Sequence, residues 1–203
     1  RSEDWLYKMF GIDAELLIDH AWGYETCRMS DIKNYHSEEH SLSNGQVLMR
    51  NYSFEEALVI VREMTDNLAL DLFEKGLVTS SLTLWIAYDH RYEHEASKGT
   101  VKLERESNSS KKIIDAVEDL YLRIADRYTG IRRIEVCANR VVPESYVQYS
   151  LFDDPKQTDK ERHLQEAVLN VKQRYGKNAI MRGSNLLECS TYRERNEQIG
   201  GHR

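Results

Sequence analysis

The sequence lacks a long apolar run and is poor in cysteine, and both shortages exclude whole classes of protein. No stretch approaches the roughly 18 apolar residues that cross a bilayer, and no basic and then apolar signal region opens the chain. The three cysteines, Cys27, Cys137 and Cys189, are odd in number and far apart, which argues against a disulfide framework or a zinc site. We therefore expect free thiols and a cytoplasmic protein.

The rest of the composition is that of a folded chain. With 203 residues, 40% hydrophobic and 31% charged, it can bury the core of one or two small domains. The net charge of −6 argues weakly against a nucleic-acid partner, although residues 156–203 are basic, with 10 basic and 6 acidic groups. The chain opens with Arg1 rather than methionine, so we expect it to be part of something longer.

Residues 1–23 predict a small helical hairpin. Apolar residues follow helical spacing up to Gly11, and Asp13 is then expected to cap a second helix that ends at Gly23. Such a hairpin can hold a phosphate through its amides and helix N-termini. A plain hairpin is the alternative, which the acidic charge of this segment favours.

Two histidine pairs raise the question of a metal site. Residues 24–43 have no sustained period and are expected to form a linker; His36 and His40 lie there beside two glutamates, but no third ligand has suitable spacing. His90 and His94 lie in the loop 89–95, which offers no fixed helix face to bring ligands together. A small metal hydrolase is therefore a weak hypothesis.

The next hundred residues alternate between strand and helix patterns. Strands are predicted at 46–52, 81–88, 100–106 and 131–141. Helices are predicted from a Ser53–Glu56 capping box to position 76, and from Ser109 or Ser110 to position 130. The order predicts an α+β fold, a split βαββαβ four-stranded antiparallel sheet with two helices on one face.

The other face of this sheet should be open. On the last strand Ile134, Val136 and Ala138 should meet the helices, and strand alternation turns their neighbours away. A tryptophan among polar and basic groups can meet a polyanion by charge and hydrogen bonds. The candidate DNA-binding residues are Arg50, Thr83, Trp85, Lys102, Arg132, Arg133 and Asn139. A solvated face with its tryptophan covered by another segment is an equal alternative.

The pentapeptide Gln148-Tyr149-Ser150-Leu151-Phe152 ends the domain. Asp153-Asp154-Pro155 follows, and the proline disfavours helix before it, so the pentapeptide should leave the domain extended. An amide with two large apolar groups suits docking on a partner, while a buried turn fits the spacing equally well. Beyond it we expect a helix from Thr158 to Tyr175 and a stretch, 177–203, that orders only on a partner.

Together these parts resemble a Y-family translesion DNA polymerase, most closely the bacterial UmuC-like (ImpB/MucB/SamB) damage-repair proteins, over nearly the whole chain. The motifs that carry the resemblance are Gly11-Ile12-Asp13, Ile18-Asp19-His20-Ala21-Trp22-Gly23, Ser43-Asn44-Gly45-Gln46, the pentapeptide and the ending Arg193-Glu194-Arg195-Asn196-Glu197-Gln198-Ile199-Gly200-Gly201-His202. The pentapeptide departs from the common Q-L-S-L-F form at Tyr149, which leaves its anchors in place.

The resemblance implies a division of the chain. The implied parts are a thumb-like helical hairpin at 1–23, a linker at 24–43, a little-finger domain at 44–145, a clamp-binding peptide at 146–155, and a C-terminal helix and basic tail at 156–203. The implied role is the DNA-holding and sliding-clamp-tethering region of an error-prone polymerase in DNA damage repair and SOS mutagenesis. The implied partners are primer-template duplex DNA, the bacterial sliding clamp and, less directly, a recombinase filament, with no membrane.

The resemblance also says what to expect of catalysis. The family's catalytic carboxylates and their Mg²⁺ ions lie in a palm domain, which nothing in this chain resembles. We therefore assign no catalytic residue, no metal ligand and no cofactor, and we expect the chain alone to be inactive. A stand-alone α+β protein-interaction module without a nucleic-acid role is the competing hypothesis.

Overall fold

The computed structural model describes residues 3–34, 40–91, 93–145 and 155–198. The chain divides into two compact units, residues 1–39 and 40–203. Within the described ranges, no helix combines the length and the apolar character that a membrane span requires.

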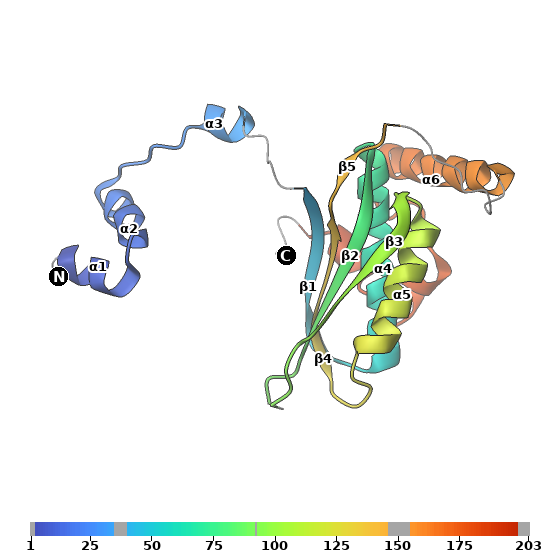
Figure 1. Cartoon of the computed structure of the whole chain (residues 1–203), viewed down its shortest axis with the longest axis horizontal. Helices are drawn as coiled ribbons and strands as arrows, with labels where there is room; N and C mark the ends of the chain where they lie inside the picture. The colour runs from blue at the N-terminus through green and yellow to red at the C-terminus, as the bar shows by residue number, and fades with distance from the viewer. Residues whose placement is uncertain (1–2, 35–39, 92, 146–154, 199–203) are drawn as a thin grey trace. The chain divides into compact units, whose positions relative to one another are not determined.

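The first unit contains three helices, α1 (Glu3–Phe10), α2 (Asp13–Trp22) and α3 (Met29–Asn34) (Figure 1). The predicted hairpin of α1 and α2 is present, and Gly11 and Gly23 take positive φ at the helix ends. The prediction that Asp13 caps α2 is wrong. The N-cap is Ile12, without a side-chain cap, because the carbonyls of Gly11 and Ile12 accept the first amides of the helix. α3 lies inside the segment predicted as a linker.

The second unit is an antiparallel sheet with helices on one face (Figure 1). Its elements are β1 (Ser41–Tyr52), α4 (Phe54–Glu74), β2 (Leu77–Tyr88), β3 (Ser97–Ser107), α5 (Ser110–Ile124), β4 (Ile131–Asn139), β5 (Val142–Pro143), α6 (Pro155–Tyr175), a 3-10 turn (Gly183–Leu186) and α7 (Tyr192–Asn196). The strand order is β1-β4-β2-β3, with β5 paired to the start of β2. The predicted split βαββαβ fold is confirmed, with one short strand added.

β1 begins earlier than predicted. The sequence pattern puts its start at Gln46, yet residues 41–47 pair continuously with residues 139–133 of β4. Asn44 lies inside the strand, and its Nδ2 donates to the Met64 carbonyl of α4 at 3.4 Å. Gly45 lies opposite Glu135 without a positive φ. The polar Asn44-Gly45 pair is therefore part of the sheet and not a turn.

The predicted N-caps of α4 and α5 agree with the structure more closely than the predicted C-terminal end of α5 does. Ser53 and Glu56 form the predicted capping box of α4, and Ser109 accepts the Lys112 amide at the start of α5. α5 ends at Ile124, six residues before the predicted stop. The chain is already extended at residue 125, and Asp126 accepts the Thr129 amide at 2.9 Å. A side-chain-stabilised turn therefore replaces the last predicted helical turn.

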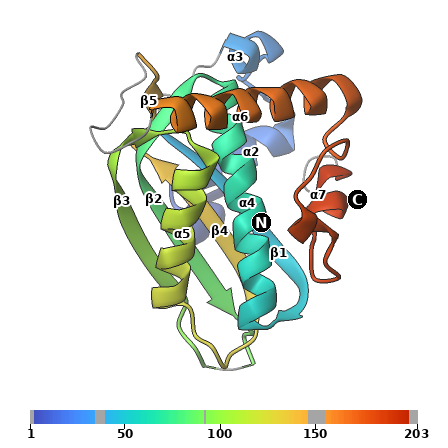
Figure 2. The same ribbon diagram turned by 90° about the vertical axis from the view of Figure 1, so that its right-hand side faces the viewer.

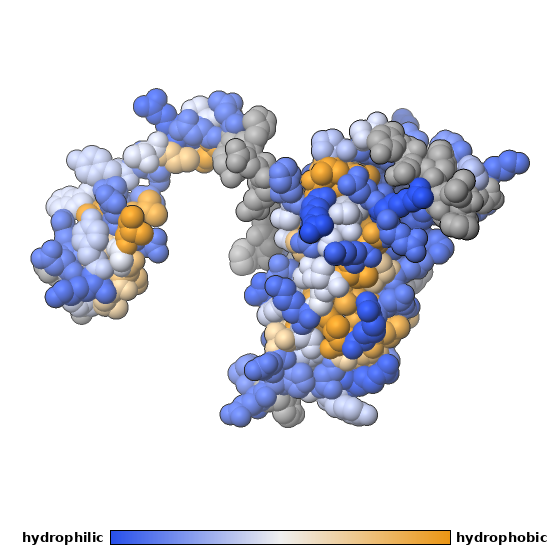
Figure 3. All heavy atoms as spheres, in the orientation of Figure 1, coloured by the Kyte–Doolittle hydropathy of each residue, from blue (hydrophilic) through white to orange (hydrophobic). Residues whose placement is uncertain are grey.

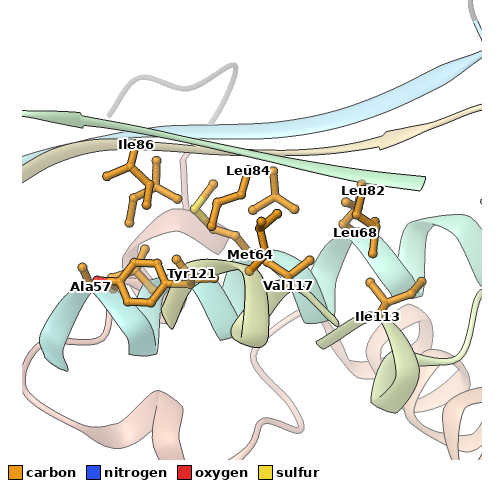
Figure 4. Packing of buried hydrophobic residues seen from close by; sticks show 14 of the residues in the cluster. Ala57, Met64, Leu68, Leu82, Leu84, Ile86, Ile113, Val117 and Tyr121 are labelled. Carbon is orange, nitrogen blue, oxygen red and sulfur yellow. The ribbon is translucent and has the colours of Figure 1, made fainter. Parts of the chain in front are cut away.

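The core lies between the sheet and α4 and α5 (Figure 4). Alternate β2 residues, Leu82, Leu84 and Ile86, are fully buried against the two helices, and each such side chain contributes roughly 1.5 to 3 kcal/mol. Tyr121 of α5 is also fully buried, and its hydroxyl donates to the Phe54 carbonyl at 2.8 Å. Leu122 of α5 is 42% exposed, because it lies on the outer side of the helix.

The C-terminal segment folds onto the domain, so the prediction that 177–203 orders only on a partner is wrong for its described part. α6 starts at Pro155, which suits a first helical position, and crosses α4 and α5 (Figure 2). Arg182 makes two hydrogen bonds to Asp66 of α4, at 2.7 and 3.0 Å. Tyr192 is 1% exposed. A buried aromatic ring and an ion pair therefore fix the segment without a partner.

Candidate functional site

The open face of the sheet is the side turned away from α4 and α5. Strand register brings four of the predicted residues together on this face: Thr83, Trp85, Arg133 and Asn139. Asn139 of β4 pairs with Ser81 of β2, and Arg133 pairs with Ala87. Thr83 and Trp85 lie between Ser81 and Ala87 on β2 and, by strand alternation, on the same face. Lys102 of β3 pairs with Ser81 and joins the same face. Ile134, Val136 and Ala138 are fully buried, which confirms that this side of β4 faces the helices as predicted.

A chain of hydrogen bonds crosses the middle of this open face. Asn139 Nδ2 donates to Thr83 Oγ1 at 2.8 Å, and the hydroxyls of Thr83 and Thr100 share a hydrogen bond of 2.9 Å. Cys137 Sγ donates to Asn139 Oδ1 at 3.4 Å. Burial raises the pKa of the Cys137 thiol, and the nearby Glu135 charge raises it further, so the thiol stays protonated at neutral pH. This part of the face is polar and hydrogen-bonded within the protein.

Trp85 and Arg133 form a second cluster on the same face. The guanidinium carbon of Arg133 lies 5.1 Å from the centre of the Trp85 ring, within reach of a cation–π interaction. Arg133 Nη2 also lies 3.4 Å from Glu135 Oε2. Part of the positive charge of Arg133 is therefore already balanced inside the protein.

Two of the predicted basic residues lie elsewhere or are engaged. Arg50 donates to both carboxylate oxygens of Glu56 at 2.7 and 2.9 Å and stacks over the Tyr52 ring at 4.2 Å. Arg50 and the Ser53 amide lower the pKa of Glu56 to about 2. Arg132 lies at the irregularity where β4 shifts register against β2, a bulge that lets both Ile131 and Ile134 face the core. Arg50 therefore serves the start of α4.

Sequence reasoning missed Lys98. This residue pairs with Trp85 across β2 and β3 and is exposed on the open face, but the predicted third strand started at Thr100. The missing signal was Gly99, which breaks the apparent strand pattern. A Cβ at Gly99 would lie 2.8 Å from Leu120 Cδ1 of α5, so this glycine allows close packing of the helix on β3 and keeps the strand continuous.

The pentapeptide Gln148–Phe152 lies outside the described residues. Its described flanks are both fixed in the second unit. Arg162 of α6 donates to both carboxylate oxygens of Glu144 at 2.8 and 2.9 Å, and Asn108 donates to the same carboxylate at 3.3 Å. The pKa of Glu144 is lowered, chiefly by the hydrogen bonds from Arg162.

The histidine pairs form no metal site in the part of the chain that the structure covers. Across the described ranges, no group of three or more His, Cys, Asp or Glu side chains could hold a metal ion. His94 packs against the Tyr88 ring at 4.3 Å and lies 3.5 Å from Asp126. Asp89, beside His90, is engaged by Arg91 and Asn51. His36 lies outside the described residues.

A concave region lies on the helix side of the sheet. It is a cavity of about 530 Å³ between α4, α5, α6 and the segment after α6, lined largely by apolar side chains such as Ile114 and Val168. Its charged groups pair with one another, Arg182 with Asp66 and Lys111 with Asp115. Such a groove is the feature an interaction module would use, but its ionic groups are satisfied within the chain.

Comparison with known proteins found a family model and curated relatives that match this chain. The model of the impB/mucB/samB family C-terminal domain matches residues 39–151. "DNA polymerase IV 2" of Bacillus subtilis is 25% identical over 203 residues, which are 98% of this chain and 47% of that protein. "DNA polymerase IV 2" of Halalkalibacterium halodurans is 21% identical over 168 residues, 82% of this chain and 40% of that protein. The chain thus spans less than half the length of these curated relatives.

Two solved structures match this chain with low TM-scores. A complex of the beta-clamp processivity factor and the little finger domain of PolIV matches with a TM-score of 0.40 and 12% identity, covering 56% of this chain and 100% of that one. A Y-family DNA polymerase chimera of Dbh and Dpo4 matches with a TM-score of 0.39 and 15% identity, covering 70% of this chain and 39% of that one. The family match extends over more than half of the chain, so this protein belongs to the impB/mucB/samB family and carries its C-terminal domain at residues 39–151.

Proposed function

We propose that this chain is the DNA-holding and clamp-tethering C-terminal region of an error-prone translesion DNA polymerase that acts in DNA damage repair and SOS mutagenesis. Its family membership and two relatives named as DNA polymerases support the polymerase context. On this proposal the compartment is the cytoplasm, the Mg²⁺ ions of catalysis belong to a separate palm domain, and a recombinase filament is a further partner to test.

The observation that supports the DNA-holding role is the open sheet face. Its centre is a hydrogen-bonded polar surface, and it carries exposed lysines and Arg133. Hydroxyl, amide and basic side chains are the groups that contact phosphate and sugar, and such contacts position a protein on DNA without reading its sequence. We expect weak duplex binding that does not depend on sequence.

A titration tests this role. Fluorescence anisotropy with two labelled duplexes of unrelated sequence should give similar affinities, both falling as salt rises, since each phosphate contact adds a log-log slope of about −0.9. Replacement of Thr83 and Trp85 together by alanine should weaken binding to both duplexes by the same factor. Absence of duplex binding at 50 mM salt would contradict the role and favour the interaction module.

The clamp-tethering role rests on the pentapeptide. Gln148 would occupy a polar socket of the bacterial sliding clamp, Leu151 and Phe152 would fill an apolar pocket, and Tyr149 and Ser150 would cross the rim. Burying one leucine and one phenylalanine contributes roughly 1.5 to 3 kcal/mol each, and ordering the segment subtracts from this. The expected affinity is micromolar, which suffices when the clamp is already held on the same DNA.

A paired substitution tests the tether. Leu151→Ala/Phe152→Ala should abolish clamp binding in surface plasmon resonance and leave the melting temperature and duplex binding unchanged. Asp153→Ala/Asp154→Ala, two neighbouring changes outside the anchors, serves as the control and should keep clamp binding. A double mutant that binds the clamp like the parent, or that unfolds, would show that the pentapeptide is a structural turn.

A further inference from the structure

Lys98 and Lys102 lie on the open face of β3, at the outer edge of the sheet. β3 pairs only with β2 in the strand order, and the two lysines oppose Trp85 and Ser81. They are four residues apart on one strand, so their Cα atoms are about 13 Å apart. Both side chains are exposed.

These lysines differ from Arg50 and Arg133, both of which form ion pairs within the protein. Arg50 is bound to Glu56, and Arg133 lies against both Glu135 and Trp85. Among the described residues, Lys98 and Lys102 have no carboxylate within ion-pair distance. A phosphate therefore needs to displace nothing to reach them, whereas it must compete with a carboxylate for Arg50 or Arg133.

As a result, the two edges of the open face differ: in the described part of the chain, unpaired lysines lie on the β3 edge and not on the β1 edge. The β1 side of this face carries Ser41, Ser43, Gly45 and Val47, which register places beside the outward residues of β4, and none of these is charged. The middle carries the Asn139–Thr83–Thr100 hydrogen-bond chain. Thr100 lies between the two lysines on β3, so its hydroxyl continues the polar surface to the edge.

We infer that Lys98 and Lys102 are the principal phosphate-contacting residues and that they hold one strand of a duplex along β3. This inference rests on the proposed DNA-holding function. A spacing of about 13 Å matches the axial rise of roughly four nucleotides on one strand, so the two ammonium groups reach different phosphates. The Asn139–Thr83–Thr100 hydrogen-bond chain then faces sugar and phosphate oxygens through its hydroxyl and amide groups. The duplex is gripped at one edge of the sheet and not across its width.

The salt dependence of duplex binding tests this inference. In the full chain, Lys98→Ala/Lys102→Ala should flatten the log-log salt slope between 50 and 200 mM by about 1.8, because two phosphate contacts are lost. Lys98→Arg/Lys102→Arg should retain the parent slope, since the charge is kept. The matched control is Lys160→Ala/Lys177→Ala, which removes two exposed lysines in and after α6, on the helix side, and should leave the slope unchanged.

The outcomes separate this inference from the proposal on which it rests. A parent chain that binds duplex with a salt-dependent affinity, and a Lys98→Ala/Lys102→Ala variant with the same slope, would overturn the assignment of these lysines and keep the DNA-holding role. Equal flattening in the control would overturn it too, since net charge alone would then explain the effect. A parent chain that does not bind would overturn both.

Discussion

At the scale of single residues, the least expected feature is that two ionisable side chains, Glu63 of α4 and Arg195 of α7, are both enclosed in the fold. Glu63 is 2% exposed, neither of its oxygens has a hydrogen-bond partner among the described residues, and Arg195 Nη2 is likewise enclosed without one. Burial raises the pKa of Glu63, and the charge of Arg195 opposes that rise. Burial likewise lowers the pKa of Arg195, and the charge of Glu63 opposes that fall, so each charge offsets part of the cost of burying the other.

Removal of both side chains should cost less than the sum of the two single removals. We expect Arg195→Met to lower the free energy of unfolding by about 1 to 3 kcal/mol, because it removes a positive charge that offsets the burial of Glu63, and Glu63→Met/Arg195→Met to cost less than the sum of the single changes. Urea unfolding measures all three. Arg193→Met, an exposed change in the same helix, should stay within about 0.5 kcal/mol of the parent. Strictly additive losses would show that the two charges do not interact.

Glu56 makes the stability of the domain depend on pH. Its pKa is held at about 2 in the folded state, below its ordinary value of 4.5, chiefly by Arg50. A carboxylate with a lowered folded pKa stabilises the fold above its unfolded pKa, and this contribution is lost as pH falls toward the folded pKa. Glu56→Gln should therefore be less stable than the parent at pH 7, with a gap in urea midpoint that narrows from pH 5 to pH 3. A gap that stays constant over this range would contradict the assignment.

Sequence reasoning located residues whose partners are near in the chain and missed those whose partners are not. The Ser53–Glu56 capping box spans three positions and can be recognised by spacing. The second role of Glu56, as acceptor for Arg50, depends on how β1 enters α4, which no periodicity encodes. Lys98 was missed because Gly99 resembles a strand end until the closeness of α5 is known.

At the scale of elements, the three helices of residues 1–39 bury very little apolar side-chain surface. Ala14 is the one buried residue among those described in this unit, and large apolar side chains such as Trp22, Met29 and Ile32 are well exposed, with orange side chains visible among blue ones in Figure 3. Ordering a residue costs roughly 1 to 2 kcal/mol of conformational entropy. Little buried apolar surface is present in this unit to offset that cost.

Deletion of residues 1–39 should therefore leave the second unit intact. Thermal unfolding of the shortened chain, followed by circular dichroism, should have a midpoint within about 2 °C of the parent, since about 1 kcal/mol corresponds to 2 to 4 °C in a domain of this size. The matched deletion is the removal of residues 177–203, which takes away Arg182 and Tyr192 and should lower the midpoint by much more. A large loss on removing 1–39 would mean that these helices stabilise the sheet domain.

Helices and strands were predictable where the apolar residues kept a regular spacing. The helix α4 follows from a spacing of 3.6 residues, and the strand β2 and the outward-facing side chains of β4 follow from a spacing of 2 residues. The first five residues of β1 and the fold of the tail did not follow, because Asn44 and Arg182 are polar residues satisfied by α4. A single sequence shows that a residue is polar but not which distant group will accept its hydrogen bond.

At the scale of the whole molecule, we expect no nucleotide incorporation. Phosphoryl transfer requires metal ions held by positioned carboxylates, and the resemblance puts those groups in a palm domain, to which no part of this sequence shows a likeness. Incubation with a primer-template, dNTPs and Mg²⁺ should leave the primer unextended, while an intact polymerase of the same family extends it under the same conditions. Template-dependent extension by the pure chain would contradict this expectation.

The contact between Thr191 and Gln46, at 3.1 Å, joins residues 145 positions apart. A ribosome adds about 5 to 20 residues per second, so Gln46 is made roughly 7 to 30 s before the residue that binds it. Throughout that interval the side of α4 that carries Glu63 and Asp66 is exposed in a nascent chain whose sheet strands are being made. Packing of the segment around Thr191 onto α4 therefore follows the synthesis of the whole sheet during translation.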